Sequence, residues 1–209
     1  METAALQARL LLPAEARDSI HPTVEAVAAL PVTRQRTRYF TESADGNTFY
    51  LGSTPDNGQV YDPDRDDVVV NLGDVEEWTL INLTGERHVF HIHQLDFLVS
   101  SINNQDIDET GLRDVIDLPY MQNGVPGQVK VKIPFTNPIM VGRFVYHCHI
   151  VGHEDAGMMA NLVVLAPGQS AMAPARMRTM LPRPQQDVFG WLAALTGKKA
   201  VPEPSLWEE

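Results

Sequence analysis

The chain has 209 residues, of which 44% are hydrophobic and 21% charged, a composition typical of a globular protein that can bury a core. Its formal net charge of −11 argues against nucleic acid and anionic membrane surfaces as partners, because both select patches of Lys and Arg. No apolar run approaches the roughly 20 residues of a membrane-spanning helix, and the single cysteine, Cys148, excludes an internal disulfide.

Composition divides the chain into three parts. Residues 1–35 are rich in Ala, Leu and Pro, and their prolines interrupt any long helix, so we expect a lead-in or linker segment. The first 20 residues lack the basic start and long apolar stretch of a signal peptide. Residues 168–209 form a Pro-rich C-terminal tail, with one short helix expected over Asp187–Leu195. The remaining residues, 36–167, have the pattern of a folded domain.

This middle part consists of short segments rich in β-branched and aromatic residues, separated by turn residues. Asp45-Gly46 is a hairpin signal between the first two segments, and Val129–Ile133 alternates between apolar and polar residues as a half-buried strand does. We expect strands over 38–41, 48–51, 68–72, 75–83, 89–93, 97–102, 129–133, 143–149 and 161–165. Many strands without clear intervening helices predict an all-β antiparallel sandwich or barrel with Greek-key connections.

Histidine is concentrated in two clusters, and the only cysteine lies inside the second. The first cluster is His88-Val-Phe-His91-Ile-His93, and the second runs through His147, Cys148, His149, His153 and Met158. A lone histidine is usually a core or surface residue. Six histidines gathered around one cysteine favour metal binding instead, since imidazole and thiolate are the ligands of transition metals.

Strand geometry sorts these residues, because side chains alternate between the two faces of a strand. The histidines that share a face are His91 with His93, and His147 with His149. Cys148 points the opposite way from its two neighbours, and His88 falls on the side opposite His91. One side therefore offers Cys148 and His88, to which the following loop adds His153 and Met158. The other side offers four imidazoles, so we interpret the clusters as two metal sites back to back.

Ligand chemistry indicates the metal of the first site. Two histidines and one thiolate, with a thioether approaching axially, form the trigonal arrangement of a blue-copper centre. Zinc would favour more cysteines or carboxylates. The all-histidine set suits copper and would equally suit zinc, iron or nickel. Met159 is the rival axial ligand, and core packing is the alternative role of either methionine; we favour Met158.

Other catalytic interpretations explain less. A cysteine hydrolase would leave five clustered histidines without a role. The acidic stretch Asp62-Pro-Asp64-Arg-Asp66 begins like a calcium loop, but it lacks the turn glycine and the bidentate glutamate, so we expect a solvated turn. Asn82-Leu83-Thr84 matches a glycosylation acceptor, a short pattern that occurs often by chance.

With these residues in view, the chain resembles the C-terminal cupredoxin domain of multicopper oxidases, the laccase and bacterial cuproxidase group. The resemblance covers about residues 36–167 and includes Asp74-Val-Glu-Glu-Trp78 and Ile133-Pro-Phe135. Its specific element is His-Cys-His followed by His five and Met ten residues after the cysteine. It implies a cupredoxin-like (plastocyanin-like) Greek-key β-sandwich with irregular N- and C-terminal extensions.

Carried over by position, the resemblance implies copper at both sites. The type 1 copper ligands would be His88, Cys148, His153 and Met158; His91 would bind the type 2 copper, and His93, His147 and His149 the type 3 pair. The resemblance also implies that Glu154 delivers protons toward the oxygen site, with an ordinary surface carboxylate as the alternative.

The family's chemistry implies how such a domain would work. A small reducing substrate would give up electrons singly at the type 1 copper, through the edge of His153 or His88. The electrons would pass from the Cys148 sulfur through the adjoining peptide to His147 and His149. Dioxygen would be reduced to water at a trinuclear cluster. An axial Met implies a reduction potential at the lower end of what such sites reach.

The chain also departs from the family. A complete oxidase has two further His-X-His motifs on an N-terminal cupredoxin domain, and outside its two clusters this chain has only His21. We therefore weigh three explanations: a C-terminal piece of a larger oxidase, assembly with a separate N-terminal subunit, or retention of the blue-copper site alone. The Ala- and Pro-rich lead-in favours the first. The resemblance implies a periplasmic or extracellular protein.

Two functions remain in competition. The leading hypothesis is an oxidase domain that works only with an N-terminal partner domain or chain. The alternative is a stand-alone blue-copper electron-transfer or copper-binding cupredoxin, which has no need for four histidines on a shared face. A structural zinc protein is a third interpretation. Phenols, bilins, cuprous or ferrous ions and amines all stay open as reducing substrates.

Overall fold

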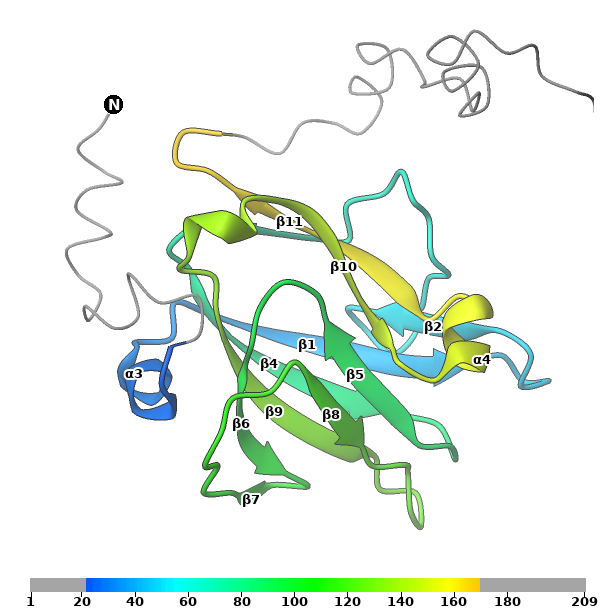
Figure 1. The fold of residues 1–209 in the computed structure, drawn as a ribbon. Coiled ribbons are helices and arrows are strands. Elements are labelled where there is room, and N and C mark those ends of the chain that lie inside the picture. The colour runs from blue at the N-terminus through cyan, green and yellow to red at the C-terminus, as the bar shows by residue number, and fades with distance from the viewer. Residues whose placement is uncertain (1–21, 170–209) are drawn as a thin grey trace, which may run out of the picture. The chain divides into compact units, whose positions relative to one another are not determined.

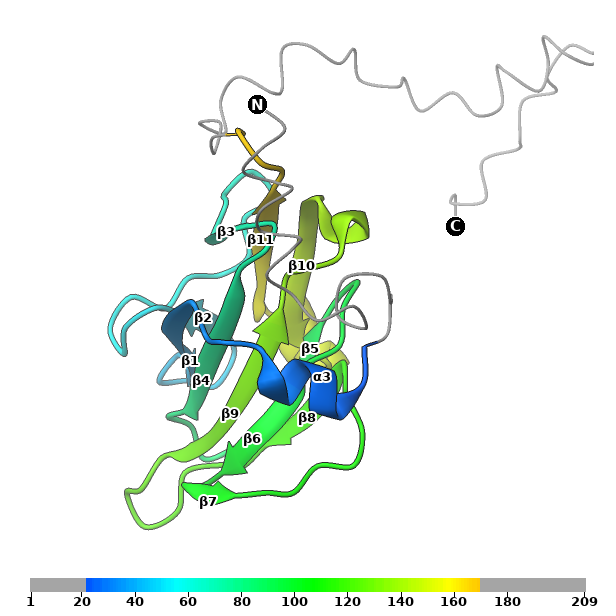
Figure 2. The same cartoon turned by 90° about the vertical axis from the view of Figure 1, so that its left-hand side faces the viewer.

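The computed structural model describes residues 22–169, so the expected helix over Asp187–Leu195 lies outside the described residues. Two β-sheets pack face to face, with one short helix before the first strand and another between the last two strands (Figures 1 and 2). In chain order the elements are α3 (Val24–Ala29), β1 (Arg34–Glu42), β2 (Phe49–Gly52), β3 (Val68–Asn71), β4 (Val75–Asn82), β5 (His88–Ile92), β6 (Leu98–Ile102), β7 (Gln105–Asp106), β8 (Val115–Leu118), β9 (Gly127–Pro134), a 3-10 turn (Pro138–Met140), β10 (Gly142–Cys148), α4 (Val151–Asp155) and β11 (Met159–Leu165). Among these residues no helix is long and apolar enough to span a bilayer.

The predicted β-sandwich is confirmed, but its sheets are mixed. The strand orders are β2-β1-β4-β9-β6-β7 and β3-β11-β10-β5-β8. The Asp45-Gly46 hairpin joins β1 and β2 as predicted. A wholly antiparallel sandwich is wrong, because β1 pairs with β4 and β3 with β11 in parallel. Turn residues in the sequence predict hairpins between consecutive strands only. After β2 the chain crosses to the other sheet to form β3 and then returns to form β4, so the parallel partners of these strands are distant in sequence.

The core lies between the two sheets and buries large side chains from both. Trp78 of β4 meets Tyr146 of β10 edge-on, with ring centroids 5.2 Å apart, and Phe90 of β5 lies beside both. Each fully buried side chain of this size contributes about 1.5–3 kcal/mol relative to its exposed state. Cys148 belongs to the same buried cluster, so the thiol lies at the margin of a dry core.

A buried carboxylate at this core is paired with a partly buried arginine. Arg36 donates to both carboxylate oxygens of Glu76, at 2.5 and 2.9 Å, and the indole nitrogen of Trp78 donates to the same carboxylate at 2.8 Å. Glu76 is fully buried. Such a carboxylate depends on its partners, because removing one leaves an uncompensated charge in the interior.

The expected lead-in contains a helix that the prolines did not predict. Thr23 caps α3 by accepting from the Ala26 N–H at 3.2 Å, and Lys132 donates to the Ala28 carbonyl at 2.8 Å. Ala26 and Leu30 form a small cluster with Val75, and α3 lies against the outer side of β6 and β9 (Figure 2). The prolines bound a six-residue helix rather than prevent one. The three-part division at residues 35 and 168 stays a prediction.

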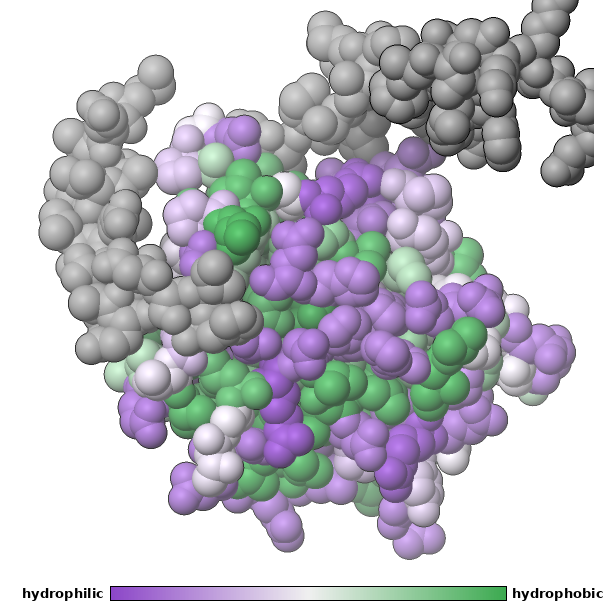
Figure 3. Space-filling model, viewed as in Figure 1, coloured by the Kyte–Doolittle hydropathy of each residue, from purple (hydrophilic) through white to green (hydrophobic). Residues whose placement is uncertain are grey.

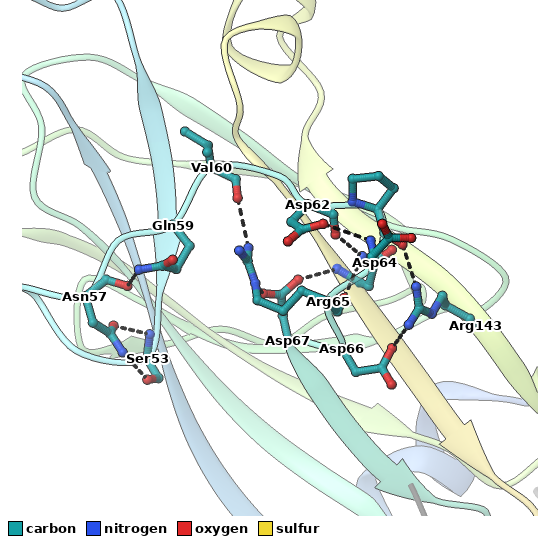
Figure 4. A network of polar contacts seen from close by, with 12 residues as sticks. Ser53, Asn57, Gln59, Val60, Asp62, Asp64, Arg65, Asp66, Asp67 and Arg143 are labelled. Atoms are coloured by element: carbon teal, nitrogen blue, oxygen red, sulfur yellow. Dashed lines mark hydrogen bonds and ion pairs between the residues drawn. The ribbon is translucent and has the colours of Figure 1, made fainter. Parts of the chain in front are cut away.

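The acidic stretch at 62–67 contains the solvated turn that we expected, with Pro63 and Asp64 exposed, but the residues around this turn are partly buried. Arg143 donates to the Pro63 carbonyl at 2.6 Å and to Asp66, while Asp67 accepts from Arg65 (Figure 4). The Asn161 side chain donates to the carbonyls of Asp62 and Arg65 at 2.8 Å each. Arginine and amide donors therefore hold this loop against β10 and β11.

The same loop packs behind the turn that follows Cys148. Tyr61 donates its N–H to the Gly157 carbonyl at 3.0 Å. Gly157 has φ +113, and a Cβ there would approach Val60 within 2.9 Å. Only glycine meets both requirements, so this residue fixes how the 149–158 segment is placed over the end of the sandwich.

Candidate functional site

A first group of side chains meets on the inner face, where β5 and β10 pair. Cys148 lies directly opposite Phe90 in this pairing, and His153 comes from α4. Cys148 Sγ is 3.7 Å from the Nδ1 atoms of both His88 and His153, and the two Nδ1 atoms are 3.0 Å apart. One thiol and two imidazole nitrogens therefore face a common point.

These separations fit a single transition-metal ion. Such an ion binds imidazole nitrogen at about 2.0 Å and thiolate sulfur at about 2.3 Å, so two nitrogens that share it are at most about 4.0 Å apart, and a nitrogen and a sulfur at most about 4.3 Å. All three separations in the structure fall below these limits. Imidazole and thiolate are donors that transition metals such as copper and zinc bind.

The surroundings of this group are aromatic and dry. The Phe49 ring stacks on His153 with centroids 4.1 Å apart, and Phe40 and Phe49 both lie against the fully buried His88. Burial, assisted by the nearby His153, lowers the pKa of His88 to about 3, so its imidazole is neutral at neutral pH and able to bind a metal.

Burial also raises the pKa of the Cys148 thiol, although an N–H from Val89, 3.4 Å from the sulfur, acts in the opposite direction. The sulfur is therefore protonated in the metal-free protein at neutral pH. Because a metal binds the thiolate, an ion that enters this group must displace the thiol proton.

The two methionines lie on different faces of the second sheet. Met159 pairs directly with His147 in the β10–β11 register, and directly opposed residues share a face. Met158 is one residue earlier and fully buried, as are Ala160 and Leu162 at the alternating positions that follow. Cys148 donates its N–H to the Met158 carbonyl at 3.0 Å. The geometry brings Met158, not Met159, to the inner side near Cys148.

A second group lies on the outer face of the same sheet. His91 pairs directly with His147 across β5 and β10. His93 Nε2 is 3.2 Å from His147 Nε2, and the His149 ring lies 5.2 Å from that of His91 between centroids. Ligand atoms of His91, His93 and His147 are close enough to hold one ion, and His149 lies beside them.

Polar contacts orient two of these rings, those of His91 and His147, through their Nδ1 atoms. His91 Nδ1 is 2.8 Å from the Asp114 carbonyl, and His147 Nδ1 is 3.0 Å from the Cys148 carbonyl and 3.1 Å from a carboxylate oxygen of Glu154. Their Nε2 atoms remain for a metal, the arrangement that outer contacts usually impose on ligand histidines. Burial, followed by the neighbouring His91 and His147, lowers the pKa of His93.

Comparison with known proteins identifies the family. A family model described as "Multicopper oxidase" matches residues 29–168. The chain belongs to the multicopper oxidase family.

Its relatives are much longer proteins. This multicopper oxidase chain is 37% identical over 115 residues to a multicopper oxidase of Staphylococcus haemolyticus, covering 52% of this chain and 24% of that protein. It is 34% identical over 116 residues to a laccase of Haloferax volcanii, covering 53% and 19%. The chain thus spans about a quarter of the length of the first curated relatives it matches.

Solved structures of the family share the fold. A multicopper oxidase from Campylobacter jejuni, described as a metallo-oxidase, superposes with a TM-score of 0.54 at 27% identity, covering 66% of this chain and 31% of that one. A multicopper oxidase from Pediococcus acidilactici gives 0.55 at 29% identity, covering 67% and 28%. The sandwich of this multicopper oxidase chain is therefore cupredoxin-like.

Sequence reasoning missed the residues behind the first group. Thr84 Oγ1 lies 2.9 Å from His88 Nε2, and Glu86 Oε2 lies 3.1 Å from His153 Nε2. The only signal was the Asn82-Leu83-Thr84 match to a glycosylation acceptor. In this multicopper oxidase chain Asn82 is fully buried and donates to the Glu86 carbonyl at 2.8 Å, so its amide is not accessible to a sugar.

Proposed function

We propose that this chain is the copper-binding C-terminal domain of a multicopper oxidase, which accepts single electrons from a reducing substrate at a type 1 copper. His88, Cys148 and His153 would hold this copper, with Met158 as axial ligand. The observation that carries the proposal is the convergence of Cys148 Sγ and two Nδ1 atoms, at 3.7 Å, 3.7 Å and 3.0 Å, on one buried point. When bound, copper supplies one-electron redox chemistry at this site and oxygen reduction at a complete cluster.

The protein's own part is to prepare the ligands. Burial keeps His88 neutral, and the stacked Phe49 ring restricts rotation of His153. The same residues exclude water from the thiolate, because His88 and Cys148 are fully buried while His153 keeps about 13% of its side chain exposed. That exposed edge supports His153 as the place where a small reducing substrate meets the domain.

The sequence order of the ligands supports coupling between the two groups. Cys148 lies in the chain between His147 and His149, with its side chain inward and theirs outward. His147 also contacts the Cys148 carbonyl through Nδ1 at 3.0 Å. One residue of backbone thus joins the first group to the second, a short covalent route for electrons.

We propose that the outer group is half of a trinuclear copper site. His91 would bind the type 2 copper, and His93, His147 and His149 the type 3 pair. The missing ligands would come from an N-terminal cupredoxin domain of the same oxidase or from a separate subunit, with dioxygen as electron acceptor. Exposed apolar residues support a partner at this face: Val115 pairs with His91 in the sheet, and Val151, 67% exposed, follows His149 by two residues. Figure 3 shows apolar surface in patches between hydrophilic residues on one face of the molecule.

Glu154 is the proposed proton carrier toward this outer group. Its carboxylate is 3.1 Å from His147 Nδ1 and 31% exposed, so it can exchange protons with water while it contacts a ring of the outer group. Glu154→Gln keeps the hydrogen-bonding shape and removes the exchangeable proton. We expect it to slow oxygen reduction while leaving copper binding at the first group unchanged.

Reconstitution tests the proposal against its alternative, a stand-alone blue-copper electron-transfer or copper-binding cupredoxin. The chain alone is expected to bind copper at the first group and consume little oxygen, and addition of an N-terminal partner domain should restore oxygen consumption. His91→Ala should abolish that gain, with Ile139→Ala as a control, because Ile139 is an exposed residue in the 3-10 turn before β10, at the opposite end of that strand from Cys148. A partner that binds without any effect of His91→Ala would contradict the oxidase proposal. Rapid electron transfer with all four outer histidines replaced would favour the alternative.

A further inference from the structure

The turn between β4 and β5 contacts both imidazoles of the first group at their outer nitrogens, through Thr84 on His88 and Glu86 on His153. We propose that Thr84 and Glu86 are positioning residues that hold both histidines in the tautomer protonated at Nε2, so that both Nδ1 lone pairs face one metal position. The identity of the metal rests on the proposed function above; the tautomers do not.

The hydrogen bonds of Thr84 favour one tautomer of His88. Asn82 donates its amide N–H to the Glu86 carbonyl at 2.8 Å, so its oxygen faces Thr84 and accepts the Thr84 N–H at 2.8 Å. The single hydroxyl hydrogen of Thr84 is shared by two groups that can only accept, Asn82 Oδ1 at 2.9 Å and the Glu86 carbonyl at 3.1 Å. Because an O···O separation as short as 2.9 Å is repulsive without a hydrogen between the atoms, these bonds favour Thr84 Oγ1 as the acceptor toward His88, with the His88 proton on Nε2.

The tautomer of His153 follows from the chemistry of Glu86. An ionised carboxylate has no hydrogen to donate, so the 3.1 Å contact between Glu86 Oε2 and His153 Nε2 places the imidazole proton on Nε2. The Glu86 side chain is 57% exposed, and ion pairs at such positions contribute little to folding. In this position the carboxylate orients the His153 ring and raises the electron density at its Nδ1 atom, the proposed ligand atom.

Together the two contacts turn both Nδ1 lone pairs toward one metal position. With both protons on Nε2, no hydrogen lies between the two Nδ1 atoms, which are 3.0 Å apart. Two lone pairs at this distance repel each other unless a cation lies between them and the sulfur, so the separation is that of a metal-bound pair, and we expect the two rings to move apart when no metal is bound. One turn thus prepares two ligands from different elements, since His88 begins β5 and His153 belongs to α4.

The first test needs no metal. In metal-free protein with ¹⁵N-labelled histidine, at about pH 8 and so above the ordinary histidine pKa of about 6.5, two-bond ¹⁵N correlation spectra report which nitrogen carries the proton. We expect both His88 and His153 as the Nε2–H form. Thr84→Val keeps the side-chain shape and removes the acceptor, so His88 should populate both tautomers; Thr84→Ser, the matched control, should restore one.

The second test uses copper ions competed against a chelator. Thr84→Val should weaken copper binding about 10–100-fold, the usual effect of losing an outer contact, and Thr84→Ser should bind as the native chain does. Glu86→Gln should lower the ratio of Cu(II) to Cu(I) affinity about tenfold, which raises the reduction potential by about 59 mV. Asp106→Asn removes the same charge from an exposed position on β7, at the edge of the other sheet, and should leave the ratio unchanged.

The outcomes separate the two proposals. An Nδ1–H tautomer of either ring in the native chain, or a Thr84→Val variant that matches the native chain in both tautomer and affinity, would overturn the positioning role. Nε2–H tautomers in a native chain that binds no copper would support the positioning role and contradict the proposed function.

Discussion

The geometry at the start of β11 predicts that substituting two adjacent methionines, Met158 and Met159, affects the first group differently. Met158, like Ala160 and Leu162 at the alternate positions that follow, is buried on the inner side of the sheet. Its carbonyl accepts a hydrogen bond from the Cys148 N–H. Met159 lies opposite His147 on the outer face. Met158→Leu removes the thioether and nearly conserves side-chain volume, so the fold should survive.

The structure sets the size of the effect on stability. Because Met158 is fully buried, Met158→Ala should lower the free energy of unfolding of the metal-free chain by about 2–5 kcal/mol, whereas Met158→Leu should cost less than about 1.5 kcal/mol. In copper-loaded protein Met158→Leu should raise the reduction potential, since the axial ligand tunes it. Denaturant unfolding and a spectroscopic redox titration measure the two quantities.

Met159→Leu is the matched control, because it makes the same chemical change one residue away and on the other face. It should leave the reduction potential at the native value. An unchanged potential in Met158→Leu, or an equal rise in Met159→Leu, would refute the assignment of Met158 by strand alternation.

Three further predictions concern the buried groups. Copper binding at about pH 7 should release one proton from Cys148, because burial raises the pKa of its thiol. Titration calorimetry in buffers of different ionisation enthalpy counts the released proton. Release of no proton would contradict copper binding to the Cys148 sulfur. Phe49→Ala should lower the free energy of unfolding by about 3–5 kcal/mol and weaken copper binding, because its buried ring stacks on His153; a loss of unfolding free energy below about 1 kcal/mol would contradict this. Arg36→Ala should cost about 3–5 kcal/mol in urea unfolding by leaving Glu76 unpaired, and adding Glu76→Gln should recover part of the loss, since the buried group is then neutral.

The sequence predicted the sandwich because its strands carry their own local signals. Asp45-Gly46 marks the β1–β2 hairpin, and the alternation at Val129–Ile133 marks β9, whose valines face the core. Parallel pairing of β1 with β4 depends on where a crossing connection returns, which no local pattern reports. The helix α3 depends on packing against β6 and β9, which prolines at its two ends do not reveal.

The candidate site was predictable to the extent that it follows strand alternation. Alternation separates Cys148 from its neighbouring histidines, and the structure brings it together with His88 and His153. The contacts from Thr84 and Glu86 were not predictable, because they join a turn to rings on other elements through single hydrogen bonds. The short motif at Asn82 indicated an unrelated modification, and only the burial of its amide shows that it shapes the turn.

The most direct measurement of the central claim is the visible spectrum of the purified chain during titration with Cu(II), beside Cys148→Ser. We expect an intense charge-transfer band that saturates at one ion per chain and is absent in Cys148→Ser, since the band arises from copper–thiolate bonding. Copper that binds without such a band, or a band that survives the loss of the sulfur, would contradict a blue-copper centre in this domain.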